Sequence, residues 1–309
     1  MSKILRIYAL LILLVLTAAS SHPCNVSAAD QAFEDSTKLP FDQANNLIVI
    51  PVTLNGRGPL RFVLDTGASH HVMKRELAQS LGLKVLGGGA LDDGTGKTVS
   101  AELIEGAVNL RIGNLTLKEQ FFVTPFPSSL PFDGFLGAAL FQKFTVRIDF
   151  RQSLITFIRP NTFRYQGSGV ILPLRFHKEL PPQVKAKVGG LVGWFKLDTG
   201  YNGSLALFAE FIERNKLRAK YAPHDSSPGG QTLVGEVGNV PHAHIHQFKL
   251  GGVVLDDVET SFFLQKGGSN SAFSGAIGTA LLSRFNVILD YHNRRMILEE
   301  ENKSSRGSK

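Results

Sequence analysis

The sequence contains one short pattern twice, an apolar strand that runs into Asp-Thr-Gly. The first copy occupies residues 62–67 (FVLDTG) and the second occupies residues 195–200 (FKLDTG). A glycine two residues after the aspartate permits the sharp turn that holds a carboxylate at a strand end. A single copy is typical of an ordinary strand-to-turn junction. Two copies, with Asp65 and Asp198 133 residues apart, predict a pair of carboxylates related by a pseudo-two-fold axis.

A longer comparison indicates that the chain is a tandem duplication. Residues 136–150 align without gaps on residues 277–291, and residues 110–117 match residues 248–255 as strand, tight turn and strand. The matches keep the same order in both copies, as expected of an internal repeat. We therefore expect two homologous lobes of about 120 residues each, at 41–160 and 169–300, joined by a polar connector at 161–168.

Strand signals dominate both copies. Residues 47–54 and 60–64 flank a turn at 55–58, and residues 183–188 and 192–197 flank a turn at 189–190, which predicts two hairpins. Short helices are expected at 74–81 and 207–215, with single helical turns at 139–143 and 280–284. The predicted fold class is all-β with a few short helices.

Both ends of the chain lie outside the predicted lobes. Residues 1–29 have the features of a secretory signal peptide, because a basic start precedes the apolar run 7–19 and small residues follow. That run is shorter than the roughly 20 residues of a transmembrane helix. We expect export to the periplasm or the medium, with membrane attachment only if the segment stays uncleaved. Residues 301–309 are expected to be a disordered tail.

Composition narrows the possible functions. Hydrophobic residues make up 43% of the 309, which is too apolar for a disordered chain. The net charge is +7, but no basic stripe with interleaved aromatic residues is visible, so no nucleic-acid partner is expected. The only cysteine, Cys24, lies in the leader, so a cleaved chain would contain neither a disulfide nor a cysteine-ligated metal.

Three histidines raise the alternative of a metal site. His242, His244 and His246 alternate along a predicted strand, so they would lie on one face, and three histidines on one face can bind zinc. The aligned positions of the first copy hold no histidine, so the fold does not require them. We expect no metal and no other cofactor.

On these residues the chain resembles the superfamily of pepsin-like and retropepsin-like aspartic proteases. The resemblance covers nearly all of the chain after the leader. It depends on four elements in the family's order, the two Asp-Thr-Gly motifs and the apolar-Gly elements Leu136-Gly137 and Ile277-Gly278. The short lobes resemble those of retroviral-type proteases and their two-lobed bacterial relatives more than those of pepsin itself. The resemblance implies the bilobal acid-protease fold, with two β-barrel-like lobes and an active-site cleft between them.

The resemblance also implies an aspartic endopeptidase that acts as a monomer on an extended peptide or protein. Asp65 and Asp198 would be catalytic, because two adjacent carboxylates share one proton, and one can then activate a water while the other protonates the scissile carbonyl. The threonines would form hydrogen bonds across the lobes and the glycines would donate N–H groups to the carboxylates. These supporting residues are Thr66, Gly67, Thr199 and Gly200.

Two positions depart from the pepsin-like pattern. The residue after Asp-Thr-Gly is usually Ser or Thr, whose hydroxyl lowers the pKa of a carboxyl group, whereas this chain has Ala68 and Tyr201. We expect both in the cleft, with raised dyad pKa values and a pH optimum less acidic than that of pepsin. Tyr201 could instead fill the catalytic space. The chain would then be an inactive protein that binds a peptide or another partner.

A glycine-rich hairpin at residues 87–100 is expected to form a flap over the cleft. Its turn would contain Asp93, Gly94, Thr95 and Gly96. Residues 226–240 are the corresponding stretch of the second copy and could form a second flap.

Overall fold

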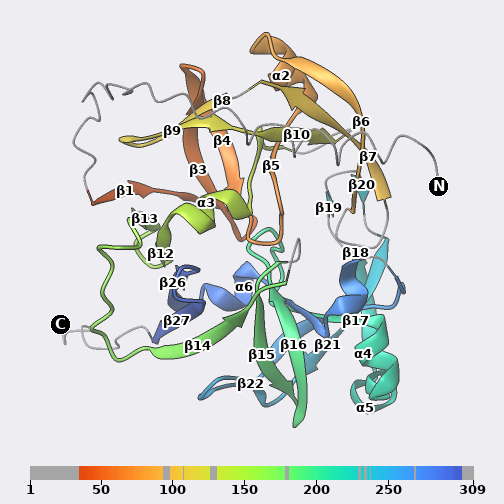
Figure 1. The fold of residues 1–309 in the computed structure, drawn as a ribbon. Coiled ribbons are helices and arrows are strands. Elements are labelled where there is room, and N and C mark those ends of the chain that lie inside the picture. Colours follow the sequence, from red (N-terminus) through yellow and green to blue (C-terminus); the bar gives the residue numbers. More distant parts are fainter. Residues whose placement is uncertain are drawn as a thin grey trace, which may run out of the picture. The chain divides into compact units, whose positions relative to one another are not determined.

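Strands make up most of the chain, and the helices between them are short (Figure 1). The computed structural model describes residues 35–92, 98–106, 108–125, 131–177, 181–228, 231–232, 235–236, 238–267 and 269–300. This architecture confirms the predicted all-β class. The predicted signal peptide, the predicted tail and the flap turn at 93–96 lie outside the described residues.

All ten strands of one sheet come from the first repeat. In spatial order its strands are β6 (Lys84–Asp92), β7 (Thr98–Glu105), β10 (Phe122–Pro125), β5 (His71–Met73), β11 (Gly134–Leu136), β4 (Arg57–Leu64), β3 (Leu47–Leu54), β8 (Val108–Ile112) and β9 (Leu115–Gln120), and β2 (Asp42–Ala44) pairs with β3. The predicted hairpin is β3–β4, but its turn contains only Asn55 and Gly56, because Arg57 already pairs with Leu54. Both turn residues have positive φ, as tight hairpin turns require.

A fifteen-stranded sheet contains strands of both repeats. Its path is β1 (Ser36–Pro40), β13 (Leu154–Ile158), β12 (Thr145–Asp149), β26 (Phe285–Asp290), β27 (Arg295–Glu300), β14 (Val170–Arg175), β15 (Gln183–Val188), β16 (Leu191–Leu197), β25 (Gly275–Ile277), β17 (Leu205–Phe208), β24 (Val258–Phe263), β21 (Asn239–Ile245) and β18 (His224–Pro228). Strands β22 (Phe248–Leu250) and β23 (Val253–Leu255) lie off this path. The two repeats meet where β12 pairs antiparallel with β26.

The helices follow the predicted positions with two differences. The described helices are α2 (Arg75–Ser80), α3 (Ala138–Lys143), α4 (Ala209–Arg214), α5 (Leu217–Tyr221), α6 (Thr279–Leu282) and the 3₁₀ turn η1 (Ser269–Ala272). The helix predicted at 207–215 begins at Ala209, because Leu207 and Phe208 pair with β24 as part of β17. Helix α5 and the 3₁₀ turn η1 correspond to no predicted element.

Equivalent strands flank the two Asp-Thr-Gly loops. In the first repeat β11 runs parallel to β4, with Leu136 opposite Leu64. In the second, β25 runs parallel to β16, with Ile277 opposite Leu197. Each apolar-Gly element therefore lies beside the strand that leads to an aspartate.

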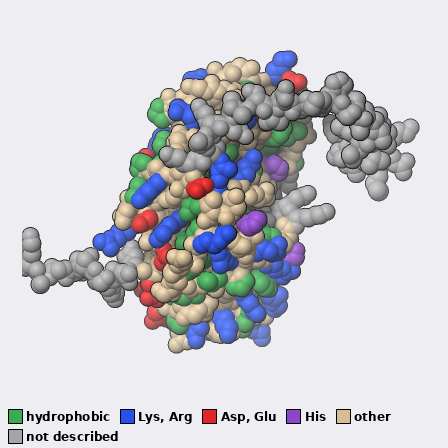
Figure 2. Space-filling view, turned by 60° about the vertical axis from the view of Figure 1, so that its left-hand side comes forward, with side chains coloured by type: hydrophobic (Ala, Val, Ile, Leu, Met, Phe, Trp, Pro, Cys, Tyr) green, Lys and Arg blue, Asp and Glu red, His purple; other side chains and the backbone are tan. Residues whose placement is uncertain are grey.

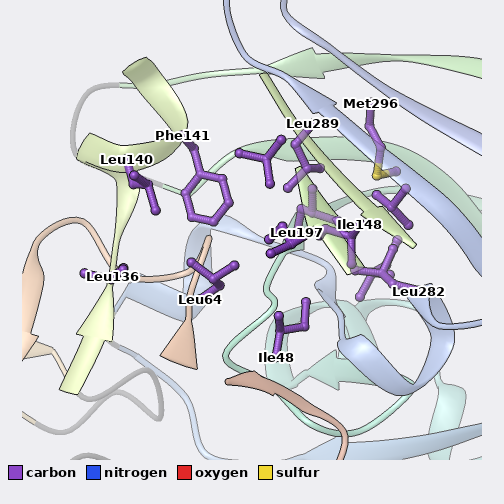
Figure 3. Close-up of a cluster of buried hydrophobic side chains, with 14 of the residues drawn as sticks. Ile48, Leu64, Leu136, Leu140, Phe141, Ile148, Leu197, Leu282, Leu289 and Met296 are labelled. Carbon is purple, nitrogen blue, oxygen red and sulfur yellow. The ribbon is translucent and has the colours of Figure 1, made fainter. Parts of the chain in front are cut away.

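The repeats share a hydrophobic core. Figure 3 shows Leu64 and Leu197, the residues just before the two aspartates, in one cluster with side chains from both repeats. Both leucines are fully buried, as are Leu136 and Leu289. Burial of several such side chains, at about 1.5–3 kcal/mol each, fixes the two strand ends against one another.

In Figure 2 the Lys and Arg side chains are interspersed with hydrophobic and neutral ones over the visible face. Within the described ranges, no helix is long and apolar enough to cross a membrane.

Candidate active site

The two aspartates follow the ends of equivalent strands. The backbone N–H of Asp65, which follows β4, donates to the carbonyl oxygen of Leu136 at 3.0 Å. The N–H of Asp198, which follows β16, donates to the carbonyl oxygen of Ile277 at the same distance. The backbone of each aspartate is thus held by the neighbouring apolar-Gly element.

A symmetric set of four hydrogen bonds joins the two loops. The hydroxyl of Thr66 donates to the carbonyl of Leu197 at 2.8 Å and accepts from the N–H of Thr199 at 3.0 Å. The hydroxyl of Thr199 donates to the carbonyl of Leu64 at 2.7 Å and accepts from the N–H of Thr66 at 3.0 Å. Both threonines are buried, so these bonds are shielded from water. They hold the two loops at a fixed separation.

Each glycine lies close to the carboxylate of the other loop. The N–H of Gly67 donates to Oδ1 of Asp65 at 2.7 Å, and that of Gly200 donates to Oδ1 of Asp198 at 3.1 Å. A Cβ atom on Gly67 would lie 2.6 Å from Oδ1 of Asp198. A Cβ atom on Gly200 would lie 2.5 Å from both carboxylate oxygens of Asp65. Only glycine therefore permits each loop to approach the other's carboxylate so closely.

This packing changes the acidity of Asp65. Burial, followed by the nearby Asp198 carboxylate, raises the pKa of Asp65 to about 7. The N–H groups of Gly67 and Ala68 and the charge of Lys196 act in the opposite direction. The pKa moves in the predicted direction, although burial is its largest cause. A carboxyl group in this range can hold a proton near neutral pH.

Lys196 is a site residue outside the predicted set. Its Nζ lies 3.0 Å from Oδ2 of Asp198, and both residues are only 8% exposed. Side chains alternate along a strand, so a residue two positions before the aspartate points to the same side. The corresponding residue of the first repeat is Val63. The available sequence signal is a lysine within an apolar strand, two residues before Asp198.

Neither residue after the two motifs brings a side-chain hydroxyl to a carboxylate. Ala68 donates its backbone N–H to Oδ1 of Asp65 at 3.2 Å. The hydroxyl of Tyr201 lies 3.0 Å from Oγ of Ser261 on β24, and its ring packs edge-on against Phe263. Burial raises the pKa of Tyr201 to about 12, so the phenol is neutral.

His71 is a buried histidine that holds the backbone of Gly137, the glycine of the first apolar-Gly element. It is 2% exposed, and its Nδ1 accepts the backbone N–H of Gly137 at 3.0 Å. Burial, followed by the charge of Lys143, lowers the pKa of His71 to about 4. A neutral imidazole therefore fixes the glycine that follows Leu136.

The three histidines of the alternative metal site bind protein partners instead. His244 pairs with Asp257 at 2.9 Å and His246 with Asp256 at 3.1 Å. His242 lies 3.4 Å from Oγ of Ser261. Among the described residues, no group of three or more His, Cys, Asp or Glu side chains is placed to hold a metal ion.

The predicted flap corresponds to the β6–β7 hairpin, the edge of the first sheet. Its strands pair from Lys84 to Asp92, while the turn residues Asp93, Gly94, Thr95 and Gly96 lie outside the described residues. In the second repeat β18 and β21 pair at the equivalent edge. A further strand pair, β19 (Gln231–Thr232) with β20 (Gly235–Glu236), lies within residues 226–240.

A row of apolar side chains connects the flap hairpin with the strand of Asp65. Partners in register across a sheet share a face. The row comprises Leu86, Leu103, Val123, Val72, Phe135 and Val63. Its first two members, on the hairpin, are 46% and 55% exposed, whereas the others are buried. The equivalent row of the second repeat is small or polar and comprises Lys196, Ala276, Ala206, Ser261, His242 and His224.

Comparisons with known proteins support the fold and, over part of the chain, the family. Residues 50–140 match the family model described as aspartyl protease, a segment that contains the first Asp-Thr-Gly but not the second. No curated protein sequence matches the chain.

Two solved structures have the same fold. The aspartic proteinase from Irpex lacteus superimposes with a TM-score of 0.55 at 12% identity, covering 89% of this chain and 100% of that one. Basic 7S globulin from soybean superimposes with a TM-score of 0.50 at 12% identity, covering 89% and 96%. The chain therefore has the bilobal fold of aspartic proteinases, and its first repeat matches the aspartyl protease family.

Proposed function

We propose that the chain is an aspartic endopeptidase that hydrolyses peptide bonds with Asp65 and Asp198. The observation that carries this proposal is the pair of interlocked loops, in which each glycine abuts the other carboxylate and Thr66 and Thr199 fix the spacing. The raised pKa of Asp65 supports it, because acid catalysis needs a carboxyl group that keeps its proton near the working pH.

The chemistry uses one proton shared by the two carboxyl groups. The ionised member takes a proton from a bound water, whose oxygen attacks the scissile carbonyl carbon. The protonated member gives its proton to the carbonyl oxygen, which would otherwise become negative. Two facing carboxylates suffice for these transfers.

We also propose that the substrate is an extended peptide that lies beneath the β6–β7 hairpin. Main-chain hydrogen bonds would bind it, and side-chain pockets would select it. The exposed Leu86 and Leu103 offer apolar contact on the hairpin, in a row that reaches the strand of Asp65 through β10, β5 and β11. The leader at 1–29 supports export, which would place the enzyme among extracytoplasmic proteins.

The direct test is cleavage of a denatured-protein mixture across about pH 3 to 8, a range that includes raised carboxyl pKa values. The products are identified by mass spectrometry for the wild type and for Asp65→Asn. We expect cleavage by the wild type and its loss in the variant, with identical circular dichroism spectra for both. Equal product patterns for the two folded proteins would contradict the proposal.

A second candidate function is binding without catalysis. It is favoured by the Lys196–Asp198 ion pair, which engages one oxygen of the dyad, and one structure with this fold is named a globulin rather than a proteinase. The same cleavage experiment separates the two. A chain that retains a peptide on a pull-down column at every pH, and never cuts it, would be a binding protein.

A further inference from the structure

Lys196 makes the surroundings of the two aspartates unequal. It occupies the position that Val63 occupies in the first repeat, since each precedes its aspartate by two residues and pairs with the adjacent parallel strand. The first aspartate therefore has an apolar neighbour and the second has a cationic one. A duplication alone would have produced the same neighbour twice.

The contacts of Asp198 are those of an ionised carboxylate. Its Oδ1 accepts the N–H of Gly200 at 3.1 Å, and its Oδ2 lies 3.0 Å from Nζ of Lys196. The ammonium also lies 5.5 Å from the ring centre of Phe208. A buried ammonium of this kind requires an opposite charge beside it, because an unpaired buried charge is costly.

The contacts of Asp65 are different. Both of its N–H donors, Gly67 and Ala68, reach the same oxygen, Oδ1. Within the described part of the chain, no group donates a hydrogen bond to Oδ2. That oxygen is therefore the better position for a proton.

On the basis of the proposed peptidase function, we propose that Lys196 is a positioning residue that keeps Asp198 ionised, so that Asp65 carries the shared proton. Asp198 is then the base that receives the proton of water, and Asp65 is the acid that protonates the carbonyl oxygen. Lys196 touches neither water nor peptide in this scheme. It acts through the carboxylate of Asp198.

With this assignment the proton transfers balance over the whole reaction. As the water oxygen bonds to the carbonyl carbon, one water proton moves to Asp198 and the proton of Asp65 moves to the carbonyl oxygen, giving a neutral gem-diol. As the C–N bond breaks, the proton on Asp198 moves to the nitrogen and one diol proton returns to Asp65. The products are a carboxylic acid and an amine, and Asp198 is again paired with Lys196 as the carboxylate.

The charges of the dyad also act on two other titratable groups, and both groups remain neutral. Tyr201 lies on the loop after Asp198, and burial raises its pKa to about 12. Tyr291 follows β26 and stacks on Phe141, and burial together with the two carboxylates raises its pKa further above the ordinary range. The charges that act on Asp65 are therefore those of Asp198 and Lys196.

The first measurement is the pH dependence of kcat/KM for the full chain, Lys196→Met and Lys196→Arg. Removal of the cation disfavours ionisation of the dyad, so both limbs of the Lys196→Met profile should move to higher pH by about 1–3 units. Lys196→Arg should stay close to the wild type. Lys185→Met, on the exposed side of neighbouring β15, is the matched control and should leave the profile unchanged. A uniform loss of activity in Lys196→Met, without a shift, would reduce Lys196 to a structural role and overturn the proposal.

The second measurement does not depend on activity. In the full chain labelled with ¹³C at the aspartate carboxyls, Asp65→Asn and Asp198→Asn assign the two dyad resonances. Between about pH 5 and 8 the Asp65 signal should titrate while the Asp198 signal stays at its ionised position. A protonated Asp198 in that range would overturn the proposal even if peptides are cleaved. If the signals behave as expected and no cleavage occurs, the proton placement stands and the peptidase function fails.

Discussion

At the scale of single residues, the site depends on buried polar groups whose partners come from the other repeat. The hydroxyl of Thr66 satisfies the carbonyl of Leu197 and the N–H of Thr199, and the hydroxyl of Thr199 does the same for the opposite loop. A buried donor or acceptor that loses its partner costs about 1–3 kcal/mol. These two side chains therefore join the loops more firmly than their size suggests.

A double-mutant cycle tests this arrangement. Thr66→Val and Thr199→Val each leave two buried backbone groups unpaired, so each should lower the free energy of unfolding by roughly 2–4 kcal/mol. The double variant should lose less than the sum, because the loops can separate once either hydroxyl is gone. Urea unfolding measures all four proteins, and Thr66→Ser, which keeps the hydroxyl, is the control. Strict additivity would argue against coupling of the loops.

His71 links the stability of the fold to pH. Its pKa is lowered to about 4 in the folded chain, whereas an unfolded histidine titrates near 6.5. As the pH falls from 6.5 towards 4, His71 binds a proton in the unfolded state but not in the folded state, so the free energy of unfolding decreases. The loss between pH 7 and pH 4 should be about 3 kcal/mol from this group alone.

The variant His71→Asn isolates that contribution. Asparagine can still accept the N–H of Gly137 but does not titrate, so the steep fall of stability below pH 6.5 should become shallower by about 3 kcal/mol. Urea unfolding of wild type and variant at pH 7 and pH 4 measures the difference, in which other titrating groups cancel. Parallel losses in both proteins would show that His71 is not responsible.

At the scale of elements, the two in-register rows of side chains that lead to Val63 and Lys196 differ, although their strands correspond. The row of the first sheet is apolar throughout and ends in the exposed Leu86 and Leu103, whereas the second contains Lys196, Ser261 and His242. We therefore expect apolar substrate side chains to bind on the side of the first lobe.

Substitution of Leu103 tests this preference. Leu103→Asn should lower kcat/KM about 5- to 10-fold for peptides with apolar side chains, since roughly half of a leucine's transfer free energy of about 1.5–3 kcal/mol is lost. Its stability should change by less than about 0.5 kcal/mol, because the side chain is 55% exposed. Val254→Asn is the matched control, because Val254 is 56% exposed on β23, outside the row. An equal effect of both substitutions would contradict a role for the row.

Much of the dyad could be predicted from sequence, and its asymmetry could not. The repeated motif is local, so the spacing of Asp65 and Asp198 with their glycines already indicates the pair. Lys196 differs from Val63 at the matching position, and only the folded strand places its ammonium against Asp198 rather than in solvent. The orientation of Tyr201 likewise depends on Ser261, 60 residues away.

Some of the secondary-structure elements could likewise be predicted from sequence, and others could not. Hairpins such as β15–β16 were predictable because the turn at 189–190 and the alternating strands are neighbours in sequence. The pairing of β12 with β26 joins segments about 140 residues apart, and no local pattern reports it. Helix α5 follows Lys216, which has a positive φ, and the sequence offers no glycine or cap to mark that start.

At the scale of the whole molecule, the two repeats, which we predicted as separate lobes, share a sheet and a hydrophobic core. Val146, Arg147 and Ile148 of β12 pair with β26, and Arg147 forms an ion pair with Glu299 at 2.9 Å. The common core in Figure 3 contains Leu64 from one repeat and Leu197 from the other. Separation of the repeats would expose that core and break the hydrogen bonds between the threonines.

We therefore expect the repeats to remain associated after the chain between them is cut. A protease-recognition sequence inserted between the exposed Gly167 and Ser168 allows cleavage without loss of any strand. The two fragments should co-elute at the size of the uncut insertion variant, and high salt should not separate them, because apolar burial rather than Arg147–Glu299 dominates the interface. Urea should release both together. Fragments that elute apart without denaturant would show that each repeat folds independently, and the dyad would then depend on the connector alone to bring its halves together.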